Sequence, residues 1–315
     1  MFIKVSTTIP AYNCEKTIGQ TIDSALSQRF DGHEIIVVND GSTDSTSSIL
    51  AGYGDRIRIV AQANRGPSAA RNAGIAFSTG KYLAFLDSDD IWLPGKLAIM
   101  TAALERNPKA SLAFSEYSLV DENCIEYRKS CFGEEAAVRE LLRKRPVPFS
   151  LLPEYIYPST WVVPREIFER TGGFSEAFKG PGYEDSWMLM VLRELGEFVY
   201  IPERLVLYRV AHPAESADKY GPGVSIFIDL LKKRYGRQAK VLIRGVKKGQ
   251  CRSLLSKVAY QMNRRDRLGA LHTLLRIATL QPGYFFTSEF IARLRLPQNR
   301  QRLRDLAAVR PGTHS

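Results

Sequence analysis

An apolar run that ends in three carboxylates is the feature that most constrains this chain. The run extends from Tyr82 to Leu86, and Asp87, Asp89 and Asp90 follow it. Its length and composition predict a strand buried on both faces, as in a parallel sheet. Carboxylates at the end of such a strand repel one another unless a cation lies beside them, and paired oxygen ligands suit Mg²⁺ or Mn²⁺ bound to phosphate. A solvated acidic turn that caps the next helix is the alternative.

Length and composition bound the fold. A chain of 315 residues can bury a full core and hold one large domain plus an extension. We expect no membrane-spanning helix, because no apolar run reaches about eighteen residues, and no signal peptide, because the N-terminus starts directly with a strand pattern. The cysteines at positions 14, 124, 131 and 251 lack zinc or Cys-x-x-Cys spacing. They predict reduced thiols in a cytoplasmic protein.

The net charge of +11 is unevenly distributed. Residues 230–315 hold 20 Lys and Arg against 3 Asp and Glu, whereas the rest of the chain holds 24 basic and 30 acidic residues. This shift predicts a catalytic domain over 1–225 and a basic helical extension over 226–315. Helical patterns near 226–245 and 268–296 mix basic and apolar residues, which favours an anionic membrane as partner. Nucleic acid is the less favoured partner, because no nucleic-acid motif accompanies the charge.

Strands and helices alternate in the first third of the chain. We expect strands over 3–9, 34–39, 56–61 and 82–86, with helices over 15–28, from 45 to about 50, and after residue 66. This alternation predicts a mostly parallel α/β sheet that binds its ligands beyond the C-terminal strand ends. Farther on we expect helices over 96–106, 134–145, from 164 and over 186–195, and strands over 111–120, 160–163, 198–201 and 205–210.

Six short motifs connect the chain to a known family. They are Ile9-Pro-Ala-Tyr-Asn13, Asn39-Asp-Gly-Ser-Thr-Asp44, Ala70-Arg-Asn-Ala-Gly74, Phe85-Leu-Asp-Ser-Asp-Asp-Ile-Trp92, Gly172-Gly-Phe174 and Glu184-Asp185. In this order they resemble the family 2 glycosyltransferases, whose GT-A type fold is a nucleotide-sugar-binding α/β sandwich. The resemblance spans roughly residues 1–220. It implies a nucleotide-sugar-binding half over 1–110 and an acceptor-binding half over 111–225.

The resemblance also implies the reaction. The enzyme would be a metal-dependent, inverting glycosyltransferase of polysaccharide biosynthesis for the cell envelope. It would move a sugar from a nucleotide-diphosphate donor, UDP above all, to a hydroxyl of a glycan or glycolipid. The expected location is the cytoplasm, with peripheral association on the cytoplasmic face of the membrane.

Donor contacts are implied for residues in the first loops and the small-residue helix. Pro10, Ala11 and Tyr12 would line the base pocket, with Tyr12 stacked on the base or, alternatively, part of the core. Asp40 would accept a hydrogen bond from a uracil N–H or a ribose hydroxyl, and capping the next helix is its alternative role. Arg71 would contact the diphosphate or pair with an Asp of a loop, and the sequence leaves both open.

The metal site is implied for the acidic loop. Asp87 and Ser88 would contact the donor, and Asp87 and Asp89 would hold Mn²⁺ or Mg²⁺. Asp90 is expected to buttress the loop. His212 is a candidate third metal ligand, because its loop resembles the family's late metal- or diphosphate-contacting segment, and a structural role is the alternative.

Asp185 is the residue predicted to perform the chemistry. An inverting transfer needs one base to take the proton of the acceptor hydroxyl, and a positioned carboxylate contributes ~10²–10⁴-fold. Favourable charge at a helix N-terminus is the alternative for Glu184 and Asp185, although one acid would suffice for that. Trp161 and Trp187 are candidates for acceptor platforms or for core packing.

The sequence bears on three other classes of protein. A nucleotide-binding dehydrogenase needs Gly-x-Gly-x-x-Gly after a strand, and the loop at 10–13 reads Pro-Ala-Tyr-Asn instead. A sugar nucleotidylyltransferase-like enzyme shares the general fold, but its first loop would be rich in glycine and arginine. A basic membrane- or nucleic-acid-binding module with a degenerate catalytic domain is the remaining alternative.

Overall fold

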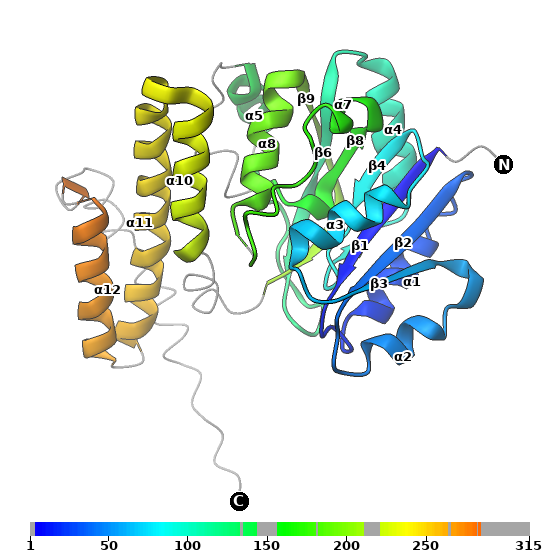
Figure 1. Cartoon of the computed structure of the whole chain (residues 1–315), viewed down its shortest axis with the longest axis horizontal. Coiled ribbons are helices and arrows are strands. Elements are labelled where there is room, and N and C mark those ends of the chain that lie inside the picture. The colour runs from blue at the N-terminus through cyan, green and yellow to red at the C-terminus, as the bar shows by residue number, and fades with distance from the viewer. Residues whose placement is uncertain are drawn as a thin grey trace, which may run out of the picture. The chain divides into compact units, whose positions relative to one another are not determined.

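The structure, a computed structural model, describes residues 4–132, 135–143, 156–180, 182–210, 221–263, 266–281 and 283–284. The chain divides into two compact units, Met1–Ala211 and His212–Ser315, and we describe each by itself (Figure 1). The domain boundaries inferred from charge and motifs, at residues 110 and 225, stay predictions.

A nine-stranded sheet forms the centre of the first unit (Figure 1). Its order is β3-β2-β1-β4-β8-β6-β9-β5, and β7 pairs with β6 outside this path. The strands are β1 (Val5–Ala11), β2 (His33–Asp40), β3 (Arg58–Gln62), β4 (Tyr82–Phe85), β5 (Ile91–Trp92), β6 (Ala110–Val120), β7 (Glu126–Arg128), β8 (Trp161–Pro164) and β9 (Glu197–Arg209). The α-helices are α1 (Ile18–Leu26), α2 (Thr46–Ala51), α3 (Pro67–Ala76), α4 (Lys96–Arg106), α5 (Glu135–Arg143), α7 (Arg165–Glu169) and α8 (Glu184–Leu195).

The first four strands form the predicted parallel half. β1 pairs in parallel with β2 and β4, and β2 pairs in parallel with β3. The apolar residues of β1, β2 and β4 are buried, whereas β3 at the sheet edge exposes Ile59. All four strands end at the same edge of the sheet, as the helix between each pair requires. The loops after β1, β2, β3 and β4 therefore meet at this edge.

The prediction of a mostly parallel sheet is wrong for the second half, because the sheet is mixed. β8 runs antiparallel to both β4 and β6, β5 runs antiparallel to β9, and β6 and β9 are parallel. The 3₁₀ turn Pro158–Thr160 explains the direction of β8. Its Ser159 hydroxyl accepts a hydrogen bond from the Asp87 N–H just beyond the end of β4, so β8 starts where β4 ends.

The strands predicted over 198–201 and 205–210 form one strand, β9. Its pairing with β6 passes from Ile201 opposite Ser115 directly to Arg204 opposite Glu116, so Pro202 and its neighbour bulge out of the ladder. A proline lacks the N–H that a ladder needs, and a bulge accommodates it without ending the strand.

The helix α3 lies close to the sheet because its contact face is made of small residues. A Cβ added at Gly74 would lie 2.2 Å from the Thr8 side chain of β1. Ala69 and Ala70 are buried on the same helix. This close approach, expected from the small residues of the segment, fixes the position of Arg71 relative to the strand ends.

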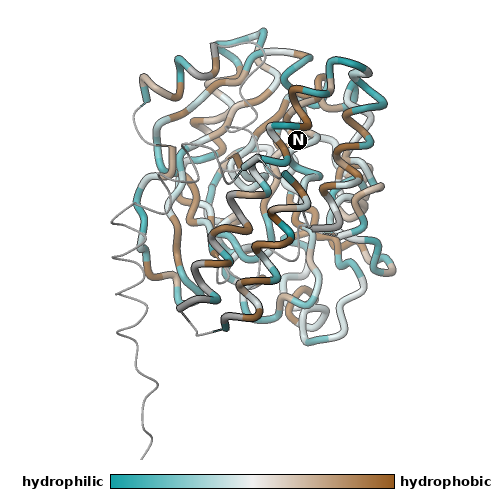
Figure 2. Tube along the Cα trace, turned by 90° about the vertical axis from the view of Figure 1, so that its left-hand side faces the viewer, coloured by the Kyte–Doolittle hydropathy of each residue, from teal (hydrophilic) through white to brown (hydrophobic). Residues whose placement is uncertain are grey.

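In the second unit, the described residues form three α-helices: α10 (Gly221–Tyr235), α11 (Ala239–Asn263) and α12 (Arg267–Leu280). Cys251 and Leu254 of α11 pack against Ile277 of α12. The opposite side of α12 exposes Leu268, Leu271 and Leu275. Figure 2 shows hydrophilic and hydrophobic positions mixed along these helices. Among the residues that the structure describes, no helix combines the length and apolarity needed to cross a membrane.

Candidate active site

The loop after β1 is held against the loop after β2. Asn13, in a left-handed conformation with φ of 47°, accepts a hydrogen bond from the Thr43 N–H at 2.8 Å and donates its own N–H to the Ser42 hydroxyl at 3.1 Å. Tyr12 projects from this junction with half of its surface exposed, whereas Ala11 is buried. An exposed ring at the strand edge suits stacking on a base, and the roles of residues 10–12 stay predictions.

Asp40 ends β2 and is 3% exposed. Its carboxylate accepts hydrogen bonds from the Gln62 amide at 2.6 Å, from the Arg65 N–H at 2.9 Å and from the Gly66 N–H at 2.8 Å. The start of α2 is capped instead by Asp44, which accepts from the first N–H of that helix at 3.0 Å. Asp40 thus fixes the loop after β3, and a carboxylate retains lone-pair capacity for a ligand.

The acidic loop is held from beneath by a buried carboxyl group. Asp90 is completely buried, and its two oxygens accept hydrogen bonds from the Ser159 hydroxyl and from the Arg209 N–H at 2.9 Å. Burial raises the pKa of Asp90 well above its ordinary value, and the charges of Asp89 and Asp87 raise it further. The expected buttressing role of Asp90 matches these contacts.

The backbone of the acidic loop is held from two sides. The Ser88 carbonyl accepts hydrogen bonds from the hydroxyl groups of Thr17 at 2.8 Å and Thr21 at 3.0 Å, both at the start of α1. The Arg209 guanidinium, at the end of β9, donates to the Asp89 carbonyl at 2.7 Å. The Asp89 side chain is exposed, so the fixed backbone presents a carboxylate to solvent.

Arg71 connects the acidic loop to the start of α8. It is 4% exposed, and its guanidinium lies 2.6 Å from the Asp87 carboxylate and 3.3 Å from the Glu184 carboxylate. The guanidinium also lies 5.3 Å from the centre of the Phe174 ring. Burial alone would lower its pKa, but the two carboxylates hold the pKa of Arg71 above its ordinary value. The structure thus shows the pairing with a loop Asp, and the diphosphate contact stays a prediction.

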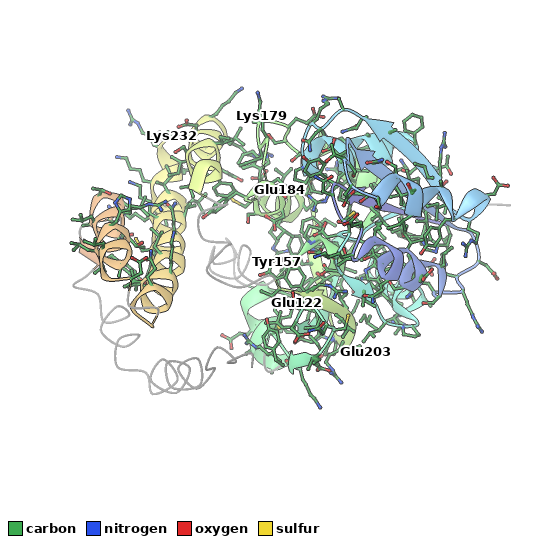
Figure 3. All side chains as sticks on the ribbon, turned by 90° about the horizontal axis from the view of Figure 1, so that it is seen from below. Glu122, Tyr157, Lys179, Glu184, Glu203 and Lys232 are labelled. Atoms are coloured by element: carbon green, nitrogen blue, oxygen red, sulfur yellow. The ribbon has the colours of Figure 1, made fainter. Side chains whose placement is uncertain are left out.

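Asp185, the predicted base, directly follows Glu184 at the start of α8. Glu184, at the start of α8, is 6% exposed and accepts a hydrogen bond from the Gly182 N–H at 2.7 Å (Figure 3). Burial raises the pKa of Asp185 to about 7 and the charge of Glu184 raises it too, while the Ser186 N–H and Arg71 oppose the rise. A carboxylate that titrates near neutral pH suits general-base catalysis.

The other predicted residues have mixed outcomes. No group of three or more His, Cys, Asp or Glu side chains in the described part of the chain is arranged to hold a metal ion. His212 lies outside the described residues.

Trp161 is completely buried and stacks on Phe174, so it packs in the core. Trp187 is half-buried on α8, and its role as an acceptor platform stays a prediction.

Sequence reasoning missed the residues that support the site from a distance. Ser159 and Arg209 contact the acidic loop although they lie 72 and 119 positions away along the chain from their partners Asp87 and Asp90. The bridge from Arg71 to Glu184 spans 113 positions. No local pattern signals such contacts. Arg71 and Glu184, however, belong to motifs that the resemblance already marks.

The mixed α/β sheet is a fold of the GT-A type. The sequence pattern of Glycosyl transferase family 2 matches residues 6–170, and the chain belongs to this family.

Relatives among known proteins are glycosyltransferases. The glycosyltransferase RP339 of Rickettsia prowazekii is 29% identical over 290 residues, which cover 90% of this chain and 88% of that protein. The glycosyltransferase RT0329 of Rickettsia typhi is 32% identical over 68% of this chain and 66% of its own length. WfgD of Escherichia coli, a UDP-Glc:alpha-D-GlcNAc-diphosphoundecaprenol beta-1,3-glucosyltransferase, is 34% identical over 38% of this chain and 48% of its own length.

A solved structure with the same fold is residues 1–349 of S. aureus TarS in complex with UDP. It superposes with a TM-score of 0.54 at 20% identity and covers 95% of this chain and 77% of that chain. The same protein in complex with UDP-GlcNAc gives a TM-score of 0.56 at 16% identity, over 90% of this chain and 81% of that chain. At this identity the likeness establishes the fold.

Proposed function

We propose that this enzyme transfers a sugar from a UDP-sugar, with inversion, to a hydroxyl of a lipid-linked glycan, and that the transfer depends on a divalent metal. The observation that carries this proposal is the Arg71 bridge. It joins a carboxylate of the acidic loop to the start of the helix that bears Asp185, at the C-terminal edge of the parallel strands. The names of WfgD and of TarS with UDP-GlcNAc support a UDP carrier.

The donor would lie across the strand ends. The exposed Tyr12 ring would stack on the base, and Asp40 would accept from the base or the ribose while it holds the loop after β3. A uracil N–H and a ribose hydroxyl are both donors, which a carboxylate accepts well. Arg71, already fixed by its two carboxylates, would bring positive charge toward the diphosphate.

Asp87 and Asp89 suit a divalent cation. The cation that accompanies a nucleotide diphosphate takes oxygen ligands, commonly one or two carboxylates beside the phosphates and water, so a cluster of three protein ligands is not required. Both side chains emerge from a backbone held by α1 and β9. When bound, Mn²⁺ or Mg²⁺ would stabilise the negative charge that develops on the leaving diphosphate.

Asp185 would act as the base. The acceptor oxygen attacks the anomeric carbon and forms the new glycosidic bond, while the bond from that carbon to the diphosphate oxygen breaks. The proton of the acceptor hydroxyl passes to Asp185, and the nucleoside diphosphate leaves with the bonding electron pair. Attack from the face opposite the leaving group inverts the anomeric centre.

The second unit would bring the enzyme to its acceptor. Lipid-linked glycans lie at a membrane, and residues 226–315 combine a strong positive charge with the exposed leucines of α12. Apolar side chains that enter the headgroup region and basic residues that attract anionic lipid are the two parts of peripheral membrane binding. We propose that this unit docks on an anionic membrane surface.

The proposal is tested by a thermal-shift screen of nucleotide sugars with and without Mn²⁺. A ligand that binds the native state alone raises the apparent melting temperature by mass action. We expect UDP-sugars to raise it only with the metal present, and GDP- and ADP-sugars to leave it unchanged. An equal rise without metal would contradict the metal dependence, and a rise with another nucleotide would contradict the UDP carrier.

A further inference from the structure

The start of α8 is held by contacts that the proposed chemistry does not itself use. Tyr183, just before the helix, has a left-handed backbone with φ of 71°, a conformation that disfavours a bulky side chain. Gly182, with φ of 113°, precedes it. Glu184 closes this turn, because one of its oxygens accepts the Gly182 N–H at 2.7 Å. The Glu184 carboxylate therefore holds the turn that directly precedes Asp185.

The other oxygen of Glu184 extends the connection to the donor side. It lies 3.3 Å from the Arg71 guanidinium, whose second amino group lies 2.6 Å from Asp87. Arg71 and Glu184 are 4% and 6% exposed, so water screens this chain of charges weakly. Among the residues that the structure describes, the buried Nε of Arg71 has no hydrogen-bond partner. Within that part of the chain, its two amino groups make the contacts to the two carboxylates.

We propose that Glu184 and Arg71 are positioning residues, which fix the start of α8 so that Asp185 faces the acceptor, and which couple that position to the donor-binding loop through Asp87. The proposal rests on the proposed role of Asp185 as the base. Removing the Glu184 carboxylate takes one of two ionic partners from the buried Arg71, which keeps Asp87, and it frees the turn that Glu184 closes. A displacement of the base by less than 1 Å lowers the rate by roughly tenfold.

The charges of the bridge act on Asp185 in opposite directions. Glu184 raises the pKa of Asp185 and Arg71 lowers it. Removing the carboxylate charge should therefore move the acidic limb of the kcat/KM profile to lower pH. Removing the guanidinium should move it to higher pH. Two residues that merely maintained the fold would lower the activity without moving this limb in either direction.

The experiment compares pH profiles of Glu184→Gln and Arg71→Met in the full-length protein, with a saturating UDP-sugar and Mn²⁺. We expect Glu184→Gln to lower kcat by about tenfold and to shift the limb down by roughly half a unit to one unit. Arg71→Met should shift it up by a similar amount. Arg71→Lys keeps the charge and should leave the limb near its original pH while it still lowers kcat.

Matched controls come from the same region. Arg65 and Glu176 form an ion pair at 2.7 Å with 61% and 43% of their side-chain surfaces exposed. Arg65→Met and Glu176→Gln are the same chemical changes at a solvated pair, so neither should shift the limb. Far-ultraviolet circular dichroism and a thermal melt identify any variant that does not fold. If Arg71→Met does not fold, the Glu184→Gln and Arg71→Lys profiles decide the result.

The outcomes separate this inference from the proposed function. Limb shifts of opposite sign in Glu184→Gln and Arg71→Met would support the coupling. If Asp185→Asn is inactive but neither of these variants moves the limb, the positioning roles are wrong while the base assignment stands. If Asp185→Asn keeps full activity, the base assignment itself fails.

Discussion

The hydrogen bonds of Asp40 lead to a quantitative prediction for Asp40→Ala. The substitution removes the acceptor of the Gly66 N–H, which is buried, and of the Arg65 N–H, which is partly buried. An unsatisfied buried N–H costs about 1–3 kcal/mol, and a partly solvated one costs less, so we expect a loss of about 2–4 kcal/mol in the free energy of unfolding. The Gln62 amide can turn to solvent and adds little.

The expected loss corresponds to a large thermal shift. For a unit of roughly 200 residues, 1 kcal/mol lowers the Tm by about 2–4 °C, so Asp40→Ala should lower it by about 4–16 °C. Gln62→Ala is the control, because it removes one bond to Asp40 at 2.6 Å but leaves both backbone N–H groups paired. It should cost about 0.5–1.5 kcal/mol. Circular dichroism during heating measures both variants.

Asp40→Asn separates stability from binding. It keeps one acceptor oxygen for the loop but loses the charge that favours a bond from the base or ribose. A hydrogen bond to a charged group contributes about 1.5–3 kcal/mol, so UDP affinity should fall roughly 10- to 100-fold by calorimetry. A melting temperature within 1 °C of wild type for Asp40→Ala would refute the account of the loop. Undiminished UDP affinity in Asp40→Asn would refute the donor contact.

Three further predictions concern the metal, a buried lysine and the second unit. Asp89→Ala should abolish Mn²⁺-dependent UDP binding in calorimetry without lowering the Tm, because the side chain is exposed and the carbonyl that Arg209 holds remains; full binding would contradict the metal assignment. Burial lowers the pKa of Lys96 to about 7, while the unfolded chain keeps that proton to about pH 10.4. The unfolded state thus binds more protons between these values, so wild-type stability should rise from pH 7 to pH 9.5 in urea titrations, and Lys96→Met should remove this rise. An equal rise in the variant would assign it to other groups. A chain that ends at residue 225 should still bind donor but lose flotation with anionic liposomes, whereas an insoluble truncation would show that the following helices complete the core.

The parallel half of the sheet could be predicted because its signals are local. The segments of β2 and β4 are apolar runs, the segment of β3 alternates, and the segments between the strands carry helical periodicity or small residues. Alternation of this kind fixes the direction of successive strands. The edge where Asp40 and the acidic loop meet follows directly from that direction.

The second half could not be predicted in the same way because its strand directions depend on distant contacts. β8 is four residues long, and its direction is set by the turn around Ser159, which is bound to the acidic loop. β5 has only two residues and β9 continues past a proline, so neither gives a regular strand pattern. The prediction of a mostly parallel sheet applied the rule of alternating strands and helices, which holds for β1 to β4, to the strands after β4 as well.

The candidate site likewise has a part that could be predicted from the sequence and a part that could not. The motifs pointed to Asp87, Asp89 and Asp185, the proposed metal ligands and base, by their position after a strand or before a helix. The Arg71 bridge requires α3 to lie close to β1, and the small residue Gly74 permits this approach. No sequence pattern, however, pairs Arg71 with Glu184. The sequence thus indicates the candidate reacting groups, whereas the contacts that join them to distant residues are visible only in three dimensions.

The most direct test of the central claim is the transfer rate of Asp185→Asn. The substitution keeps the size of the side chain and the start of α8 but removes the basic carboxylate. We expect UDP-sugar affinity to change little, because the proposed donor contacts lie on the loops after β1 to β4. We expect kcat to fall by at least ~10²-fold, the scale of a lost general base. A variant that binds the donor and transfers the sugar at the wild-type rate would contradict the account.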